Sequence, residues 1–206
     1  SLSGIGERDL RLWLHAQTCS EVSKASYLRS VRAVFGWALS KGWLKKNPAR
    51  GIKLRYRQRI RPWLNHADWP AFLAACSPCH RIRAMFVMET GLRSKEVRFA
   101  RWDWLHGIIG RKAIRIADDP DTGFTPKGGQ ARAVPLTERA MEALELARQR
   151  WGSSGFIFSD SGLRAPNFAR ENRLACARAE LTHVDFQGLR RTAGARWLEL
   201  GIALHD

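Results

Sequence analysis

Apolar residues recur at helical spacing near the start of the chain. Leu10, Trp13 and Leu14 fall on one helical face, which predicts a first helix with that face buried. A second helix is predicted from Ser23, whose hydroxyl can cap the first turn, to about Gly42. Its expected inward residues are Leu28, Val31, Phe35, Ala38 and Leu39. The N-terminal part is therefore expected to be helical.

Beyond residue 62 the pattern becomes mixed. Asn65 and Asp68 have the spacing of a capping box, and a later helix is expected to end at Gly91. Alternation over 113–117 and 131–136 predicts two hairpin strands. The remaining expected elements are a short strand at 156–159 and helices after Thr137, at 166–181 and at 186–200. The fold class is thus mainly α with a small antiparallel β-sheet (α+β), and the nine tryptophans are expected to fill its core.

Composition narrows the function classes. The 206 residues include 35 Lys+Arg and 19 Asp+Glu, giving a net charge of +16, and 45% are hydrophobic. That is enough apolar surface for one or two domains, and the charge favours a polyanion such as nucleic acid over a neutral small molecule. An anionic membrane surface is the weaker alternative. No apolar stretch of about 18 residues and no signal peptide are visible, so a soluble, intracellular protein without a membrane partner is expected.

The positive charge is concentrated at the N-terminus. Residues 1–62 hold 14 Lys+Arg and 3 Asp+Glu, and the span 41–61 contains no acidic residue. Because Asn47-Pro48 and Gly51 interrupt a helix there, we expect a domain at 1–50, a basic linker at 51–62 and a second domain at 63–206. The expected DNA contacts are Lys24, Ser26, Tyr27, Arg29 and Arg32 on the second helix and Arg55, Arg57 and Arg59 in the linker.

The four cysteines form one local pattern, Cys76-Ser-Pro-Cys79-His80. This string matches a redox pair and a haem attachment site, but a structural turn after a helix explains it as well. Zinc would need a second pair of ligands that the sequence does not show. We therefore expect reduced thiols and no cofactor.

Three basic residues occupy places where local structure would fix their direction. Arg93 opens a helix after Gly91, with Glu96 one turn along. Lys127 is at the tip of the turn between the two hairpin strands. Arg190 shares a helix face with Gln187, three residues before it. Surplus surface cations are not placed in this way, so these residues are candidates for one anion site.

The strings that carry these residues resemble a known family. Thr90-Gly-Leu-Arg93, Lys127 ahead of Arg132-Ala-Val-Pro-Leu136, and Gly188-Leu-Arg-Arg-Thr192 are similar, in order and spacing, to the catalytic domain of the tyrosine recombinases, or phage integrases. Ser26-Tyr-Leu-Arg-Ser-Val-Arg and Trp43-Leu-Lys-Lys-Asn-Pro48 resemble the family's SAM-like core-binding domain. The resemblance covers nearly the whole chain.

The resemblance implies site-specific recombination of double-stranded DNA through a phosphotyrosyl bond, without metal or ATP. By the same resemblance Arg93 and Arg190 stabilise the phosphate, Glu96 orients Arg93, and Lys127 protonates the departing 5′ oxygen. Gln187 takes a position where the family usually has histidine. Self-assembly into tetramers on paired DNA sites is also implied, in a bacterial or phage-encoded protein that is cytoplasmic and associated with DNA.

Two departures from the family pattern matter. Gln187 cannot accept and return a proton. His183, four residues upstream, could replace the family's histidine, but a histidine just before a helix more often has a structural role. The two tyrosines, Tyr27 and Tyr56, are both far from the family's nucleophile position. Since the chain starts with Ser1 and stops where the family pattern continues, we expect a fragment whose nucleophile lies beyond residue 206 and which is inactive alone. The alternative is a catalytically inactive integrase-like DNA-binding protein.

Overall fold

The computed structural model describes residues 4–56, 61–108, 111–159 and 163–202. The chain divides into two compact units, Ser1–Ile60 and Arg61–Asp206. Each unit has its own cluster of buried apolar side chains. None of the described helices is long and apolar enough to cross a bilayer.

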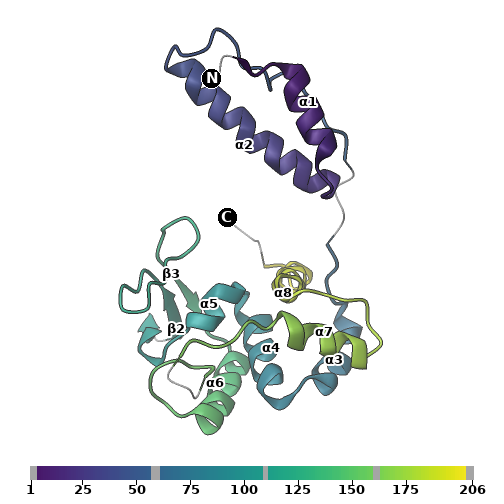
Figure 1. Ribbon diagram of the computed structural model, residues 1–206. Helices are drawn as coiled ribbons and strands as arrows, with labels where there is room; N and C mark the ends of the chain where they lie inside the picture. The colour runs from purple at the N-terminus through teal and green to yellow at the C-terminus, as the bar shows by residue number, and fades with distance from the viewer. Residues whose placement is uncertain (1–3, 57–60, 109–110, 160–162, 203–206) are drawn as a thin grey trace. The chain divides into compact units, whose positions relative to one another are not determined.

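The first unit contains two helices, α1 (Glu7–Ala16) and α2 (Glu21–Ser40), drawn in purple in Figure 1. Both helices were expected, but the predicted cap at Ser23 is wrong. Helix α2 begins earlier because Ser20 is extended and its hydroxyl accepts a hydrogen bond of 3.3 Å from the Ser23 backbone N–H. The core of this unit consists of Leu10, Leu14, Leu28, Phe35, Ala49 and Ile52.

Residues after α2 complete that core. Arg32 of α2 donates from Nε to the carbonyl oxygen of Ala49 (3.0 Å) and from Nη2 to that of Ile52. Ile52 is buried, so the chain at the start of the expected linker packs inside the first unit.

The expectation that the tryptophans fill the core is wrong for the first unit. Trp13 is 39% exposed, and its ring lies 6.2 Å from that of Tyr27. Trp37 and Trp43 are also exposed and meet edge to face at 4.9 Å, and Leu39 is exposed as well. A core between only two helices is small, so it cannot bury all the apolar side chains of both helices.

The second unit is mostly helical with one small sheet. Its helices are η2 (His66–Asp68), α3 (Trp69–Ala75), α4 (Pro78–Thr90), α5 (Ser94–Phe99), η3 (Trp102–Trp104), α6 (Glu138–Trp151), α7 (Ala169–Arg178) and α8 (Phe186–Glu199). Strands β1 (Leu105–Ile108), β2 (Arg111–Ile116) and β3 (Arg132–Pro135) form an antiparallel sheet in the order β1-β2-β3. Helix α4 packs against both α6 and α8 (Figure 1). The fold class expected from the sequence is confirmed.

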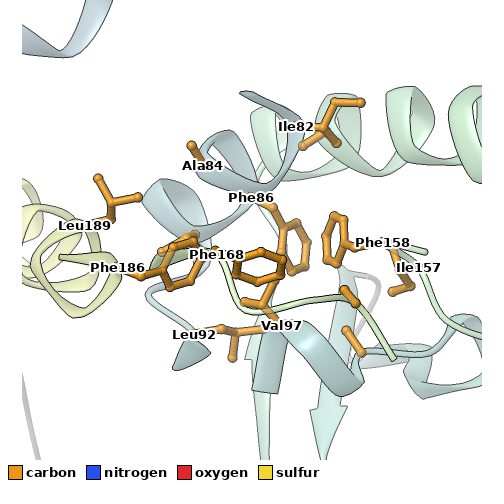
Figure 2. Close-up of a cluster of buried hydrophobic side chains, with 14 of the residues drawn as sticks. Ile82, Ala84, Phe86, Leu92, Val97, Ile157, Phe158, Phe168, Phe186 and Leu189 are labelled. Carbon is orange, nitrogen blue, oxygen red and sulfur yellow. The ribbon is translucent and has the colours of Figure 1, made fainter. Parts of the chain in front are cut away.

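Aromatic side chains fill the centre of this unit (Figure 2). The rings of Phe86 on α4 and Phe158 lie 5.2 Å apart, and those of Phe168 and Phe186 lie 4.9 Å apart. Leu189 of α8 is buried in the same cluster. The ring of Phe186 also lies 6.4 Å from that of His80 on α4, so the aromatic cluster joins α8 to α4, the arrangement on which the candidate site depends.

Two local predictions in this unit are wrong, and one strand was missed. Asn65 makes no capping hydrogen bond, because a 3-10 turn (His66–Asp68) separates it from α3, which begins at Trp69 with Pro70 in its first turn. The expected strand at 156–159 is a single bridge between Phe156 and Arg101, and the two residues that follow, Ile157 and Phe158, are buried. Strand β1 was not predicted because Gly107, a residue type that is depleted in strands, interrupts its short alternating pattern.

Candidate active site

The junction between α4 and α5 fixes the first candidate arginine. Gly91 ends α4 in the left-handed conformation (φ 59°), and Arg93 is the N-cap of α5. The Arg93 backbone N–H donates to Glu96 Oε2 at 2.7 Å, and its Nη1 donates to Glu96 Oε1 at 3.1 Å. Glu96 therefore holds both the backbone and the guanidinium of Arg93, as the sequence suggested.

Helix α8 brings the second candidate arginine to the same place. Arg190 Nη1 donates a hydrogen bond of 2.6 Å to the carbonyl oxygen of Gly91. Burial, and then the positive charge of Arg93, lower the pKa of Arg190 from its usual high value. Two arginines separated by almost a hundred residues in the chain are thus neighbours.

A third arginine, Arg132, was not singled out from the sequence. It begins β3, and its Nη2 donates to Glu96 Oε2 at 2.7 Å. Burial raises the pKa of Glu96, but the hydrogen bonds from Arg132 and Arg93 together lower it by more than burial raises it. The pKa of Glu96 is therefore below its usual range. The only sequence signal for Arg132 was its place in the string that follows the Lys127 turn.

The side chains of Arg93, Arg132 and Arg190 line one cleft of about 1020 Å³. Its polar lining residues are Arg93, Arg132, Gln187, Arg190 and Arg191. Its apolar lining residues include Trp63, Val134, Pro135, Trp197 and Leu198. A cleft lined by several guanidinium groups is suited to an oxyanion, because each fork offers donors in a fixed geometry.

Gln187 lies one turn before Arg190 on α8 and lines the same cleft. Its side-chain amide can donate to an anion but cannot take up a proton. His183 is exposed in the segment before α8 and is not among the residues of the cleft.

Lys127 does not line the cleft. It is exposed on a turn closed by a hydrogen bond of 3.0 Å from the Gly129 N–H to the Pro126 carbonyl oxygen. The base of this turn contacts α5, where Lys95 Nζ lies 3.4 Å from the carbonyl oxygen of Thr125. The structure therefore brings together four of the five predicted catalytic residues and leaves Lys127 outside.

The DNA-binding candidates of the first unit differ in their availability. Lys24 pairs with Glu21 at 2.9 Å, and Arg32 is engaged by the backbone of Ala49 and Ile52. Four candidates are exposed: Ser26, Tyr27, Arg29 and Arg55. Arg57 and Arg59 lie outside the described residues.

The cysteine string has a structural explanation. His80 is fully buried, and its Nε2 lies 3.1 Å from Asn172 Oδ1. Burial raises the pKa of Cys76 to about 12, so this thiol stays protonated at neutral pH. Across the described part of the chain, no three His, Cys, Asp or Glu side chains could hold a metal ion together.

The sequence matches two family models. Residues 62–206 match the Phage integrase family, and residues 8–57 match the Phage integrase SAM-like domain. Prophage integrase IntZ of Escherichia coli (strain K12) is 25% identical over 167 residues, which are 77% of this chain and 40% of that relative. The chain thus spans less than half the length of this curated relative.

Solved structures share the fold. The Tn1549 transposon integrase in complex with circular intermediate DNA has a TM-score of 0.75 at 16% identity, over 98% of this chain and 76% of that chain. A lambda integrase tetramer bound to a Holliday junction has a TM-score of 0.73 at 17% identity, over 97% of this chain and 59% of that chain. At such identities the likeness shows the fold alone.

Proposed function

Because this chain belongs to the phage integrase family, we propose that it acts in site-specific DNA recombination, integrating or excising DNA through a phosphotyrosyl intermediate. The observation that carries the proposal is the meeting of Arg93 and Arg190 at one cleft, each with only one guanidinium nitrogen hydrogen-bonded within the described residues. The remaining donors are available to the nonbridging oxygens of a phosphate.

The roles of the other residues follow from their chemistry. Glu96 orients Arg93, and Gln187 donates to a phosphate oxygen. Lys127 protonates the departing 5′ oxygen once its turn moves to the phosphate. A flexible primary ammonium suits such a transfer, because its pKa falls when it is desolvated beside other cations.

The nucleophile is a tyrosine outside these 206 residues. Tyr27 and Tyr56, the two tyrosines of the sequence, both belong to the first unit. The phenolate oxygen attacks phosphorus, the bond from phosphorus to the 5′ oxygen breaks, and a 3′-phosphotyrosyl bond forms. Since Gln187 cannot accept the phenol proton, that proton passes to water.

DNA is held by both parts of the chain. The proposed organisation is a SAM-like domain at 1–50, a basic linker at 51–62 and a catalytic domain from residue 63. The net charge of +16 supports a duplex as the partner. Assembly into tetramers on paired sites is proposed from the lambda integrase tetramer that shares this fold.

One observation favours a second candidate function. Gln187 replaces a residue that could assist the nucleophile, which would suit an integrase-like protein that occupies DNA without cutting it.

A trapping experiment separates the two candidates. A nicked duplex carrying the recombination site is incubated with the 206-residue chain, and with the protein extended through the next tyrosine. We expect an adduct that survives SDS only with the extended protein, and none when the added tyrosine is replaced by phenylalanine. Binding without an adduct in the extended protein would favour the inactive alternative.

A further inference from the structure

Glu96 creates an electrostatic difficulty for the site. It orients Arg93, but a carboxylate 3.1 Å from the guanidinium also offsets its positive charge. Because Glu96 is only 1% exposed, water screens this effect poorly. Arg93 and Glu96 alone would present no net charge to a phosphate.

Arg132, which lies on a different element, offsets the negative charge of Glu96. It reaches from β3 to Glu96 Oε2, the oxygen that also accepts the Arg93 backbone N–H, while Oε1 accepts Arg93 Nη1. The Arg132 side chain is 34% exposed and lines the cleft. With Arg190 included, three arginines and one glutamate leave the site a net charge of +2.

We propose that Arg132 is a positioning residue of this site, which neutralises and holds Glu96 so that Arg93 keeps both its orientation and its attraction for a phosphate. This inference rests on the proposed function. Arg132 acts through Glu96, so its loss should change the ionisation of that carboxylate as well as the affinity of the cleft for anions.

The charged groups that face Glu96 come from three parts of the fold. They are Arg93 at the N-cap of α5, Arg132 from β3 and Arg190 from α8. Burial disfavours the ionised form of Glu96, and without Arg132 one fewer hydrogen-bond donor would stabilise that carboxylate. The pKa of Glu96 should then rise, whereas a purely structural loss elsewhere in the fold would not move it selectively.

The experiment uses the 206-residue chain titrated with inorganic phosphate at constant ionic strength. NMR follows the Nε–Hε signals of Arg93 and Arg190 and the side-chain carboxyl carbon of Glu96. We expect phosphate to shift both arginine signals with one dissociation constant. Arg132→Gln should weaken phosphate binding about tenfold and raise the pH at which Glu96 titrates. Arg132→Lys should stay within about threefold of wild type, because it keeps the charge.

The outcomes separate this inference from the proposed function. Arg139 is exposed on α6, so Arg139→Gln is the matched control and should bind as wild type does. If Arg132→Gln binds like this control while Arg93→Gln does not, the inference is overturned and the function stands. If neither Arg93→Gln nor Arg190→Gln weakens binding, the proposed function fails as well. Should Arg132→Gln not fold, a loss in Arg132→Lys as large as that in Arg93→Gln overturns the inference.

Discussion

Arg190 on α8 donates a 2.6 Å hydrogen bond to the carbonyl oxygen of Gly91, the residue that ends α4. Trp197, two turns further along α8, lies against the same glycine, where an added Cβ would be 2.7 Å from its ring. Gly91 is therefore the point at which the helix carrying one candidate arginine meets the turn leading to the other. Any side chain there would push α8 away from Arg93.

Gly91→Ala should be strongly destabilising. The substitution combines a left-handed backbone, which costs about 1–2 kcal/mol for a residue with a Cβ, with an overpacking cost of about 1–3 kcal/mol. Urea unfolding should show that the free energy of unfolding falls by about 2–5 kcal/mol. Gly123 is the matched control, because its φ is +66° and its Cβ would meet nothing within 4 Å. A loss in Gly91→Ala no larger than in Gly123→Ala would show that the Trp197 contact does not matter.

His80 should make the fold sensitive to mild acid. Burial lowers the pKa of His80 below its ordinary value of about 6.5. The hydrogen bond with Asn172 acts in the opposite direction, and the positive charge of Arg83 lowers the pKa as well. The unfolded chain therefore binds a proton that the folded chain does not. The contribution of neutral His80 to the free energy of unfolding is fully present above about pH 6.5, and it is lost as the pH falls toward the lowered pKa.

The check is the free energy of unfolding at pH 7.5 and pH 5.0. His80→Gln keeps a donor for Asn172 Oδ1 and removes the titrating ring, so it should lose less stability between these values than wild type does. Glu171, which also faces His80 and favours its charged form, is unchanged in both proteins. Equal losses would mean that other groups carry the pH dependence.

DNA binding by the 206-residue chain should depend steeply on salt. Each phosphate neutralised by the protein contributes about 0.9 to the slope of log K against log salt, so six contacts give a loss of orders of magnitude between about 50 and 200 mM. Replacing the exposed Arg29 and Arg55 by glutamine should lower that slope by about two. Arg148→Gln is the control, since Arg148 already pairs with Glu145 on α6. An unchanged slope would place the contacts elsewhere.

Lys127 should have a selective effect on strand cleavage. In the extended protein, Lys127→Ala should slow cleavage of normal DNA, because the departing 5′ oxygen needs a proton. A substrate with sulfur in place of that oxygen needs little proton donation, so it should restore this variant but not Arg93→Ala. If sulfur rescues both variants or neither, Lys127 is not the proton donor.

Residue patterns in the sequence predicted which helices and strands form better than they predicted where each one begins and ends. The αL glycine ending α4 and the Thr137 cap of α6, whose hydroxyl accepts from the Ala140 N–H at 3.1 Å, follow from residue type alone and are confirmed. The family resemblance is confirmed as well. Ser20 competed with Ser23 for the cap of α2, and only the position of the helix start decides between two such residues.

The composition of the site depended on tertiary contacts. Arg93 and Glu96 are three residues apart, so their pairing was visible in the sequence. Arg132 meets Glu96 only because the fold brings the start of β3 to α5, which no periodicity reveals. Lys127 has the expected position on the turn, but the direction of a turn is not encoded by the residues that form it.

The cleavage rate of the extended protein, measured in a single turnover with saturating DNA, tests most directly the claim that Arg93 and Arg190 act on one phosphate. Arg93→Ala and Arg190→Ala should each lower this rate about 10²- to 10³-fold, because they remove donors that act mainly in the transition state. The DNA affinity of each variant should change less than about threefold, since each residue is one cation among 35. Cleavage that survives both substitutions, or a fall in rate that is matched by an equal fall in affinity, would contradict the account.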